Sequence, residues 1–157
     1  MRTVLPGRLL GAVSCAALAA SALALAPVAA AGMKVGNYSF NIEGRYDFHK
    51  WLWMVNSCNR PDQTTDCALI SAVARPVAKA YDWNGHAQVI NGRWSMVVDV
   101  PDGLRCGDIY YGPVIPTHDV YSWDPVTLAG TLESSSDVGC DNAPGGTITY
   151  PFTLTIY

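Results

Sequence analysis

Apolar and polar residues alternate in stretches that lie far apart in this chain, and this alternation most constrains what it can fold into. Tyr38, Phe40 and Ile42 alternate with polar residues, and residues 147–156 show the same pattern near the other end. A period of two puts successive side chains on opposite faces of a β-strand. No long segment combines helical apolar spacing with helix caps, so we predict an all-β fold.

The dipeptide Asn91-Gly92 predicts a β-hairpin, because it favours the tight two-residue turn between antiparallel strands. In the register that this turn sets, Val89 faces Trp94 and Ala87 faces Met96. Opposed residues share one face of a hairpin, and all four of these are apolar. The intervening positions are mostly polar, so we predict one core face and one solvent face.

A second hairpin is predicted around Cys58 and Cys67, which flank a polar loop. If the two cysteines face one another, each bulky tryptophan of the first strand meets an alanine of the second. The pairs are Trp53 with Ala72 and Trp51 with Ala74. Such size complementarity fills a core layer without overlap. Both faces contain apolar residues, which indicates a central strand pair.

These segments predict an antiparallel sandwich or small barrel of about seven to nine short strands, held together by disulfides. Pro151 cannot donate a ladder hydrogen bond, so we expect the last strand to be an edge or to bulge there. Residues 106–120 contain several glycines and prolines and are predicted as a long loop with a short aromatic strand at 109–111. Residues 76–83 are compatible with a loop or a single helical turn.

Residues 1–31 have the pattern of a secretory signal peptide. A basic start precedes an apolar run over residues 9–26, and small residues lead to Ala31. We expect cleavage near Ala31, which leaves a mature domain of residues 32–157 with no transmembrane segment. The protein is therefore expected outside the cytoplasm, either secreted freely or associated with the cell envelope.

Export places the four cysteines of the mature domain in an oxidising compartment, where disulfides form. Four cysteines allow three connectivities, and loop entropy alone does not choose among them. Opposed strand residues have Cα atoms close enough for a disulfide, so the hairpin register favours Cys58 with Cys67. Cys106 and Cys140 then form the second pair.

The charge balance of the mature domain limits its partners. The full chain has 10 basic and 13 acidic residues, and two of the basic ones lie in the signal peptide. Binding to nucleic acid or to anionic lipid depends on clustered basic residues, so neither is expected. No residue spacing indicates a metal site and no motif indicates a cofactor, so we expect neither. The expected partner is an extracellular or envelope ligand of unknown identity.

A few acidic and histidine residues are the visible candidates for catalysis. They are Glu43, Asp47 and His49, and the neighbours His118 and Asp119. Asp47 and His49 would share one strand face, whereas His118 and Asp119 would lie on opposite faces. No Gly-x-Ser-x-Gly motif is present, and each histidine is better explained as an ordinary surface or core residue. We therefore assign no catalytic residue.

Aromatic side chains outside the predicted core are the candidates for a binding surface. They are Tyr110, Tyr111, Tyr121 and Trp123. These residues lie near prolines and glycines, whereas Trp53 and Trp94 lie on predicted core faces. Exposed aromatic rings stack on sugars and contact apolar ligands, so a binding surface is expected at these four residues.

The order of several short motifs resembles a group of small exported proteins of mycobacteria and related actinobacteria. The motifs are Trp53 with Cys58 and Cys67, the run Asn91-Gly92-Arg93-Trp94, Cys106, residues 122–131 and Cys140. The most distinctive is Trp-Asp-Pro-x-Thr-Leu-x-Gly-Thr at residues 123–131. The resemblance covers nearly all of residues 35–157. It implies secretion and a disulfide-bonded β fold, without an assigned activity or catalytic residues.

We therefore predict a non-enzymatic binding module that acts outside the cell or at its envelope. The alternative is a secreted hydrolase of envelope glycans or lipids that uses the acidic and histidine residues named above. The geometry discriminates between them, because a histidine and carboxylates that converge in one cleft favour the hydrolase. Polar residues scattered around an aromatic patch favour binding.

Overall fold

The computed structural model describes residues 32–45, 50–58, 66–75, 83–108 and 111–157. These residues form eight strands and one short 3-10 turn, Cys140–Asn142. The strands are β1 (Gly36–Ile42), β2 (Lys50–Ser57), β3 (Cys67–Arg75), β4 (Trp83–Ile90), β5 (Arg93–Arg105), β6 (Val114–Trp123), β7 (Ala129–Val138) and β8 (Pro144–Ile156). The all-β prediction is confirmed.

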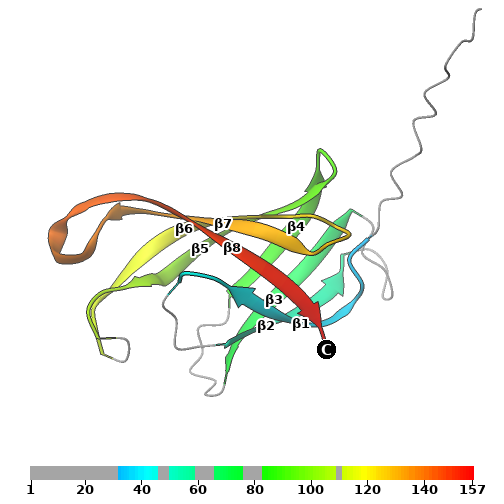
Figure 1. The fold of residues 1–157 in the computed structure, drawn as a ribbon, viewed down its shortest axis with the longest axis horizontal. Helices are drawn as coiled ribbons and strands as arrows, with labels where there is room; N and C mark the ends of the chain where they lie inside the picture. Colours follow the sequence, from blue (N-terminus) through cyan, green and yellow to red (C-terminus); the bar gives the residue numbers. More distant parts are fainter. Residues whose placement is uncertain (1–31, 46–49, 59–65, 76–82, 109–110) are drawn as a thin grey trace, which may run out of the picture.

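The eight strands form a closed antiparallel barrel in which each strand pairs with the next one in the chain (Figure 1). The barrel closes where β8 pairs with β1, from Tyr38 opposite Ile156 to Ile42 opposite Phe152. Closure gives each strand two neighbours, which removes the exposed edges that an open sheet would have. Of the two architectures expected from the sequence, the barrel is therefore the one that forms.

Both predicted hairpins have the expected register. Trp53 pairs with Ala72 between β2 and β3, and Val89 pairs with Trp94 between β4 and β5. The turn between β4 and β5 has positive φ at both central residues, 52° at Asn91 and 77° at Gly92. These angles are those of a type I′ turn, whose twist matches the flanking strands.

Both predicted disulfides are present. Cys58 is bonded to Cys67 with a Cα–Cα distance of 5.7 Å, and Cys106 to Cys140 with 5.5 Å. The first bond joins the residue after β2 to the first residue of β3. The second joins the β5–β6 connection to the β7–β8 connection, so it links two hairpins that are adjacent in the barrel.

The expectation of a long loop over residues 106–120 is wrong from Val114 onward, because β6 begins there. Residues 109 and 110, where a short aromatic strand was expected, lie outside the described residues. The strand tolerates Pro116 because this residue lies opposite a register shift in β5, between Val100 and Leu104. The ladder is already interrupted at this point, so the missing N–H of proline breaks no regular hydrogen bond.

The last strand is not an edge, which corrects the expectation drawn from Pro151. β8 pairs with β7 on one side and with β1 on the other. The carbonyl oxygen of Pro151 accepts a hydrogen bond of 2.9 Å from the backbone N–H of Glu43. The nitrogen and the carbonyl of one strand residue point to the same neighbour, so the proline nitrogen faces the β1 side. There it lies just past Ile42, the last paired residue of β1.

A turn that begins at Asp124 connects β6 to β7. The Asp124 carboxylate accepts hydrogen bonds from the backbone N–H of Thr127 (2.7 Å) and of Val126 (2.9 Å). These two bonds are the main reason why the pKa of Asp124 lies below its ordinary value. The distinctive motif of residues 123–131 therefore encodes a turn in which a carboxylate binds the chain's own backbone.

The two ends of the barrel are filled differently. At the end with the Asn91-Gly92 turn, Trp53, Trp94 and Trp123 are fully buried. Their rings contact one another, with centroids 5.6 Å apart for Trp53 and Trp123 and 6.0 Å for Trp94 and Trp123. Aromatic side chains thus occupy the interior here, as in other small barrels. We call this the aromatic end.

At the opposite end, the β5–β6 and β7–β8 hairpins extend beyond the other strands (Figure 1). β1 stops at Ile42, whereas β8 begins at Pro144, eight positions before Phe152, the residue that pairs with Ile42. Fewer of the described strands therefore enclose the interior at this end, between Ile42 and the Cys106–Cys140 disulfide. We call it the open end.

Candidate functional site

The interior of the barrel changes from aromatic to polar along β6. Alternate residues of this strand point inward, and in order from the aromatic end they are Trp123, Tyr121, Asp119 and Thr117; all four are buried. The neighbouring strand follows the same trend, because Leu132 pairs with Tyr121, and Ser134 pairs with Asp119. At the open end, β6 and β7 therefore contribute polar side chains to the interior, whereas Val98 and Val100 of β5, which pair with Asp119 and Thr117, are buried and apolar.

Asp119 is a fully buried carboxylate at the centre of this polar layer. Its Oδ1 accepts a hydrogen bond of 2.6 Å from the Ser134 hydroxyl, and its Oδ2 accepts a longer one of 3.4 Å from the Tyr121 hydroxyl. The Arg45 Nη1 atom lies 3.7 Å from Oδ2. A buried charge is costly unless it is paired and hydrogen-bonded, and these three groups supply that compensation.

Arg45 connects three parts of the open end. It follows β1 in the chain, its Nη1 faces Asp119 on β6, and its Nη2 donates a hydrogen bond to the carbonyl of Gly103 in the bulged part of β5. Gly103 has no side chain, and a Cβ at this position would overlap the side chain of Thr117. The bulge and the glycine thus bring the β5 backbone close to the polar interior.

Thr117 carries a buried hydroxyl that has no hydrogen-bond partner among the described residues. Leaving a buried hydroxyl unpaired costs about 1–3 kcal/mol. Each such group in a folded protein requires an explanation, and a functional site is one of them. The three buried tryptophan N–H groups that are also unpaired lie at the aromatic end instead.

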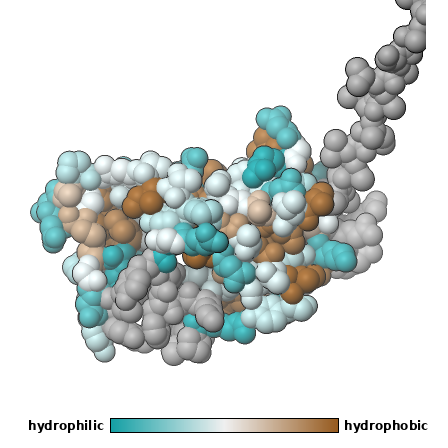
Figure 2. Space-filling view, in the orientation of Figure 1, coloured by the Kyte–Doolittle hydropathy of each residue, from teal (hydrophilic) through white to brown (hydrophobic). Residues whose placement is uncertain are grey.

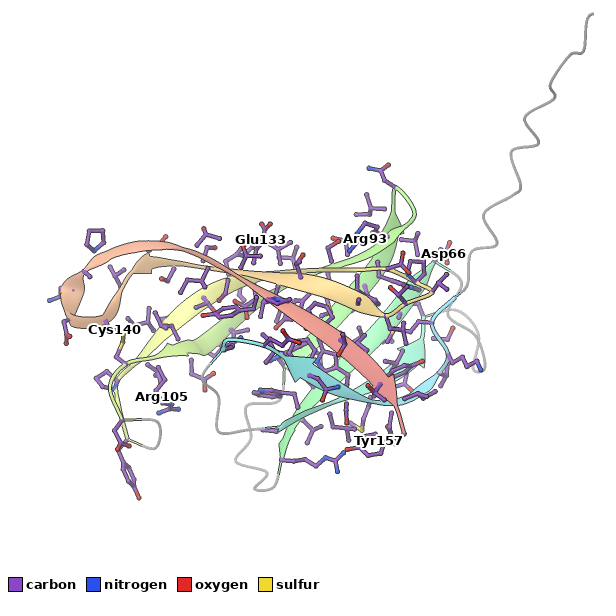
Figure 3. All side chains as sticks on the ribbon, viewed as in Figure 1. Asp66, Arg93, Arg105, Glu133, Cys140 and Tyr157 are labelled. Atoms are coloured by element: carbon purple, nitrogen blue, oxygen red, sulfur yellow. A yellow bond between two sulfur atoms is a disulfide. The ribbon has the colours of Figure 1, made fainter. Side chains whose placement is uncertain are left out.

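A cavity of about 290 Å³ opens between the two extended hairpins, and we call it the polar cavity. Its walls include residues 103–105 of β5, Thr117 of β6, two serines of β7 and residues 146–148 of β8. Arg105 and Gly139, which also line it, are the chain neighbours of the two bonded cysteines. Figure 3 shows Arg105 and Cys140 on this part of the molecule, away from the aromatic end. The disulfide therefore links the walls of the polar cavity.

A second arrangement lies on the outer surface of the same strands. Asp99, His118 and Ser135 occupy paired positions on β5, β6 and β7 and line a groove of about 450 Å³. His118 Nδ1 is 2.7 Å from Asp99 Oδ1. Their side chains are 55% and 87% exposed, and the Ser135 hydroxyl donates to the His118 carbonyl (3.1 Å) instead of to the imidazole. The row has the residue types of a catalytic triad without a serine–histidine hydrogen bond.

The catalytic candidates from the sequence are separated in the structure. His118 is exposed and Asp119 is buried, which confirms that they lie on opposite faces. The partner of His118 is Asp99 of β5. This pair could not be predicted from the sequence, because a long connection between β5 and β6 leaves their register undetermined. Glu43 is exposed, and Asp47 and His49 lie outside the described residues.

The aromatic binding candidates do not form one exposed cluster. Tyr111 is 91% exposed, whereas Tyr121 and Trp123 are 2% and 0% exposed and belong to the core. The period-two pattern explains this difference, because both buried residues share the inward face of β6. Tyr110 lies outside the described residues. Whether Tyr111 takes part in binding stays a prediction.

Exposed apolar side chains are dispersed over the surface. The largest exposed fractions, apart from Tyr111, are those of Tyr157, Val126 and Ile90, which belong to three different parts of the chain. Figure 2 shows apolar and polar side chains interspersed on one face. Single exposed apolar residues of this kind are ordinary and do not indicate a partner surface.

No three histidine, cysteine or acidic side chains come together as a possible metal site in the part of the chain that the structure describes. None of the described residues forms a helix that is long and apolar enough to cross a membrane.

Comparisons with known proteins do not assign the chain to a family. No family model matches it, and neither the curated proteins nor the solved structures contain a match. The polar cavity and the outer groove therefore have to be interpreted from their own geometry.

Proposed function

We propose that this protein is an exported binding protein that holds a small molecule in the polar cavity at the open end of the barrel. The observation that carries the proposal is Thr117, which lines this cavity and has a buried hydroxyl without a hydrogen-bond partner among the described residues. A ligand that pairs with this group would remove the cost of leaving it unsatisfied. Small-molecule sites commonly combine such a concave space with a few well-placed polar groups.

The surroundings of the cavity support binding because they are held in place before a ligand arrives. Arg45 and Ser134 lie in the cavity wall, and both contact Asp119 behind it. The Cys106–Cys140 disulfide holds the two hairpins together at the outer end. A preorganised site loses less conformational entropy on binding, which favours affinity.

Two disulfides in a barrel of this size suit an oxidising environment outside the cytoplasm. The signal peptide expected in residues 1–31 supports secretion, and the resemblance to small exported actinobacterial proteins supports the same location. We include secretion and association with the cell envelope in the proposal.

Native mass spectrometry of protein secreted by its own cells tests the proposal directly. We expect a bound small molecule that Thr117→Val loses, because valine has a similar shape but no hydroxyl. Thr131→Val is the matched control, since Thr131 is exposed on β7. Absence of a bound mass, together with a small-molecule screen that shifts no amide signal of the cavity residues, would contradict the proposal.

A second function is favoured by the close contact between His118 and Asp99. In a hydrolase, Ser135 Oγ would attack an ester carbonyl while its proton passes to His118 Nε2, the ester C–O bond would break, and the alcohol would leave with that proton. Water, deprotonated by His118, would then attack the acyl-serine, release the carboxylic acid and restore the Ser135 hydroxyl. Removing such a general base typically costs about 10²–10⁴-fold in rate. Turnover of p-nitrophenyl acetate that both His118→Ala and Ser135→Ala abolish would replace the binding proposal. Turnover that is absent or unaffected by both changes excludes this role for the outer row.

A further inference from the structure

We infer that the ligand of the polar cavity is a small organic carboxylate, an inference that rests on the proposed binding function. Two guanidinium groups, those of Arg45 and Arg105, line the cavity. No acidic side chain is among the described residues that line it. A wall with two cations and several hydroxyl groups favours an anion over a neutral or cationic ligand.

Arg105 supplies the second positive charge of the wall. Its Nη1 donates to the carbonyl of Gly112 (3.2 Å), and no carboxylate pairs with it in the described part of the chain. A guanidinium has five N–H donors, and the bond to Gly112 uses one of those of Arg105 among the described residues, so donors remain for a ligand. Arg45 differs, because Asp119 already offsets part of its charge. The local charge of these three groups is therefore one positive, although the whole chain has a formal charge of −3.

The shape of a guanidinium favours a carboxylate. Its planar fork can donate two parallel hydrogen bonds to the two oxygens of a carboxylate. Thr117 lies in the same wall, and its hydroxyl, which is buried against Gly103, has no partner among the described residues. An anion bound here would pair with the Arg105 guanidinium.

The size of the cavity and its apolar residues require more than an inorganic anion. One water occupies about 30 Å³ in the liquid, so a volume of about 290 Å³ holds roughly ten non-hydrogen atoms. Leu104, Ile148 and the ring of Tyr150 form apolar parts of the wall. A carboxylate with a compact apolar body fills this space and covers these side chains, whereas phosphate or sulfate would leave them in contact with water.

Benzoate and benzamide form a matched pair of probes, because they have nearly the same shape and differ in charge. We expect NMR titration of the disulfide-bonded protein to show that benzoate binds about ten- to a hundredfold more tightly than benzamide, as charge-assisted hydrogen bonds predict. The amide signals of Thr117 and residues 146–148 should shift. Inorganic phosphate is the third probe and should bind more weakly than benzoate.

Arg105→Gln tests whether this guanidinium selects the anion. We expect it to lower the affinity for benzoate about tenfold or more and to leave the affinity for benzamide unchanged. Arg93→Gln is the control, because Arg93 also donates to a backbone carbonyl, that of Ser122, but lies beside the turn at the aromatic end. It should change neither affinity.

The possible results separate this inference from the proposed function. Equal affinity for benzoate and benzamide at the cavity residues, or equal loss of both in Arg105→Gln, overturns the carboxylate inference and leaves the binding function standing. Phosphate that binds at least as tightly as benzoate overturns it as well. If no probe and no member of a wider small-molecule screen shifts the cavity signals, both the inference and the binding function are wrong.

Discussion

Replacing both Cys106 and Cys140 with alanine removes the covalent link between the two hairpins that form the polar cavity. These cysteines are 34 positions apart in the chain, whereas Cys58 and Cys67 are nine positions apart. A disulfide limits the conformations of the unfolded chain, and the effect increases with the length of the closed loop. The chain-entropy relation gives about 3.8 kcal/mol for the long loop and about 2.7 kcal/mol for the short one.

The two pairs also differ in what they hold together. Cys106–Cys140 links the walls of the polar cavity, and Cys58–Cys67 joins β2 to β3 within one hairpin. The double variant Cys106→Ala, Cys140→Ala should therefore lose both stability and affinity for benzoate. The matched variant Cys58→Ala, Cys67→Ala should lose stability alone, because the cavity walls stay linked.

Urea unfolding followed by tryptophan fluorescence measures the stability difference. With a typical slope of about 2 kcal/mol per molar urea, the midpoint should fall by about 1.9 M for the first variant and about 1.3 M for the second. NMR titration with benzoate measures the affinity. If the short-loop variant is destabilised as much as the long-loop variant, the loop-entropy argument is refuted. Equal affinity in both variants would refute the role of the long-loop disulfide in shaping the cavity.

Three further changes test local features. Gly103→Ala should destabilise the fold by about 1–3 kcal/mol in urea unfolding, because the added Cβ overlaps a side chain of β6. Gly146→Ala, in the same cavity wall but facing open space, should be close to neutral, and equal effects would contradict the packing argument. Gly92→Val should cost more than about 1 kcal/mol, since valine resists the positive φ of this turn, and an unchanged midpoint would exclude a tight turn. The pKa of Asp124 is lowered, chiefly by the hydrogen bond from the backbone N–H of Thr127. The Asp124 carboxylate therefore stabilises the fold at a pH above the ordinary aspartate pKa. This stabilisation is lost as the pH falls from that value to the pKa of the folded state. The stability difference between the wild type and Asp124→Ala should shrink over that acidic range, and a difference that stays constant on acidification would contradict the hydrogen-bonded turn.

The candidate site could have been found in part from the sequence. Thr117, Asp119, Tyr121 and Trp123 alternate along one strand, so the inward direction of the two aromatic residues also places Asp119 inward. The prolines and glycines of residues 106–120 obscure that signal, because these residue types favour a loop. Pro116 is tolerated only because β5 bulges opposite it, a feature that depends on the pairing of β5 with β6.

Local patterns were sufficient for the hairpins and for the disulfides. The Asn91-Gly92 turn and the alternation around it set the register of β4 and β5, and the tryptophan–alanine pairs set that of β2 and β3. Each relation joins residues that are close in the chain, so turn geometry and side-chain size decide it without knowledge of the remaining fold. With one disulfide assigned in this way, only one partner remained for each of the other two cysteines.

Closure of the barrel and the polar cavity were decided by tertiary structure. β1 and β8 come from opposite ends of the described chain, and no local sequence pattern predicts that Ile42 pairs with Phe152. The contacts of Asp119 with Arg45 and Ser134 join β6 to the chain after β1 and to β7. Alternation shows which side chains of a strand share one face, but only closure of the barrel determines which of them come into contact in the interior.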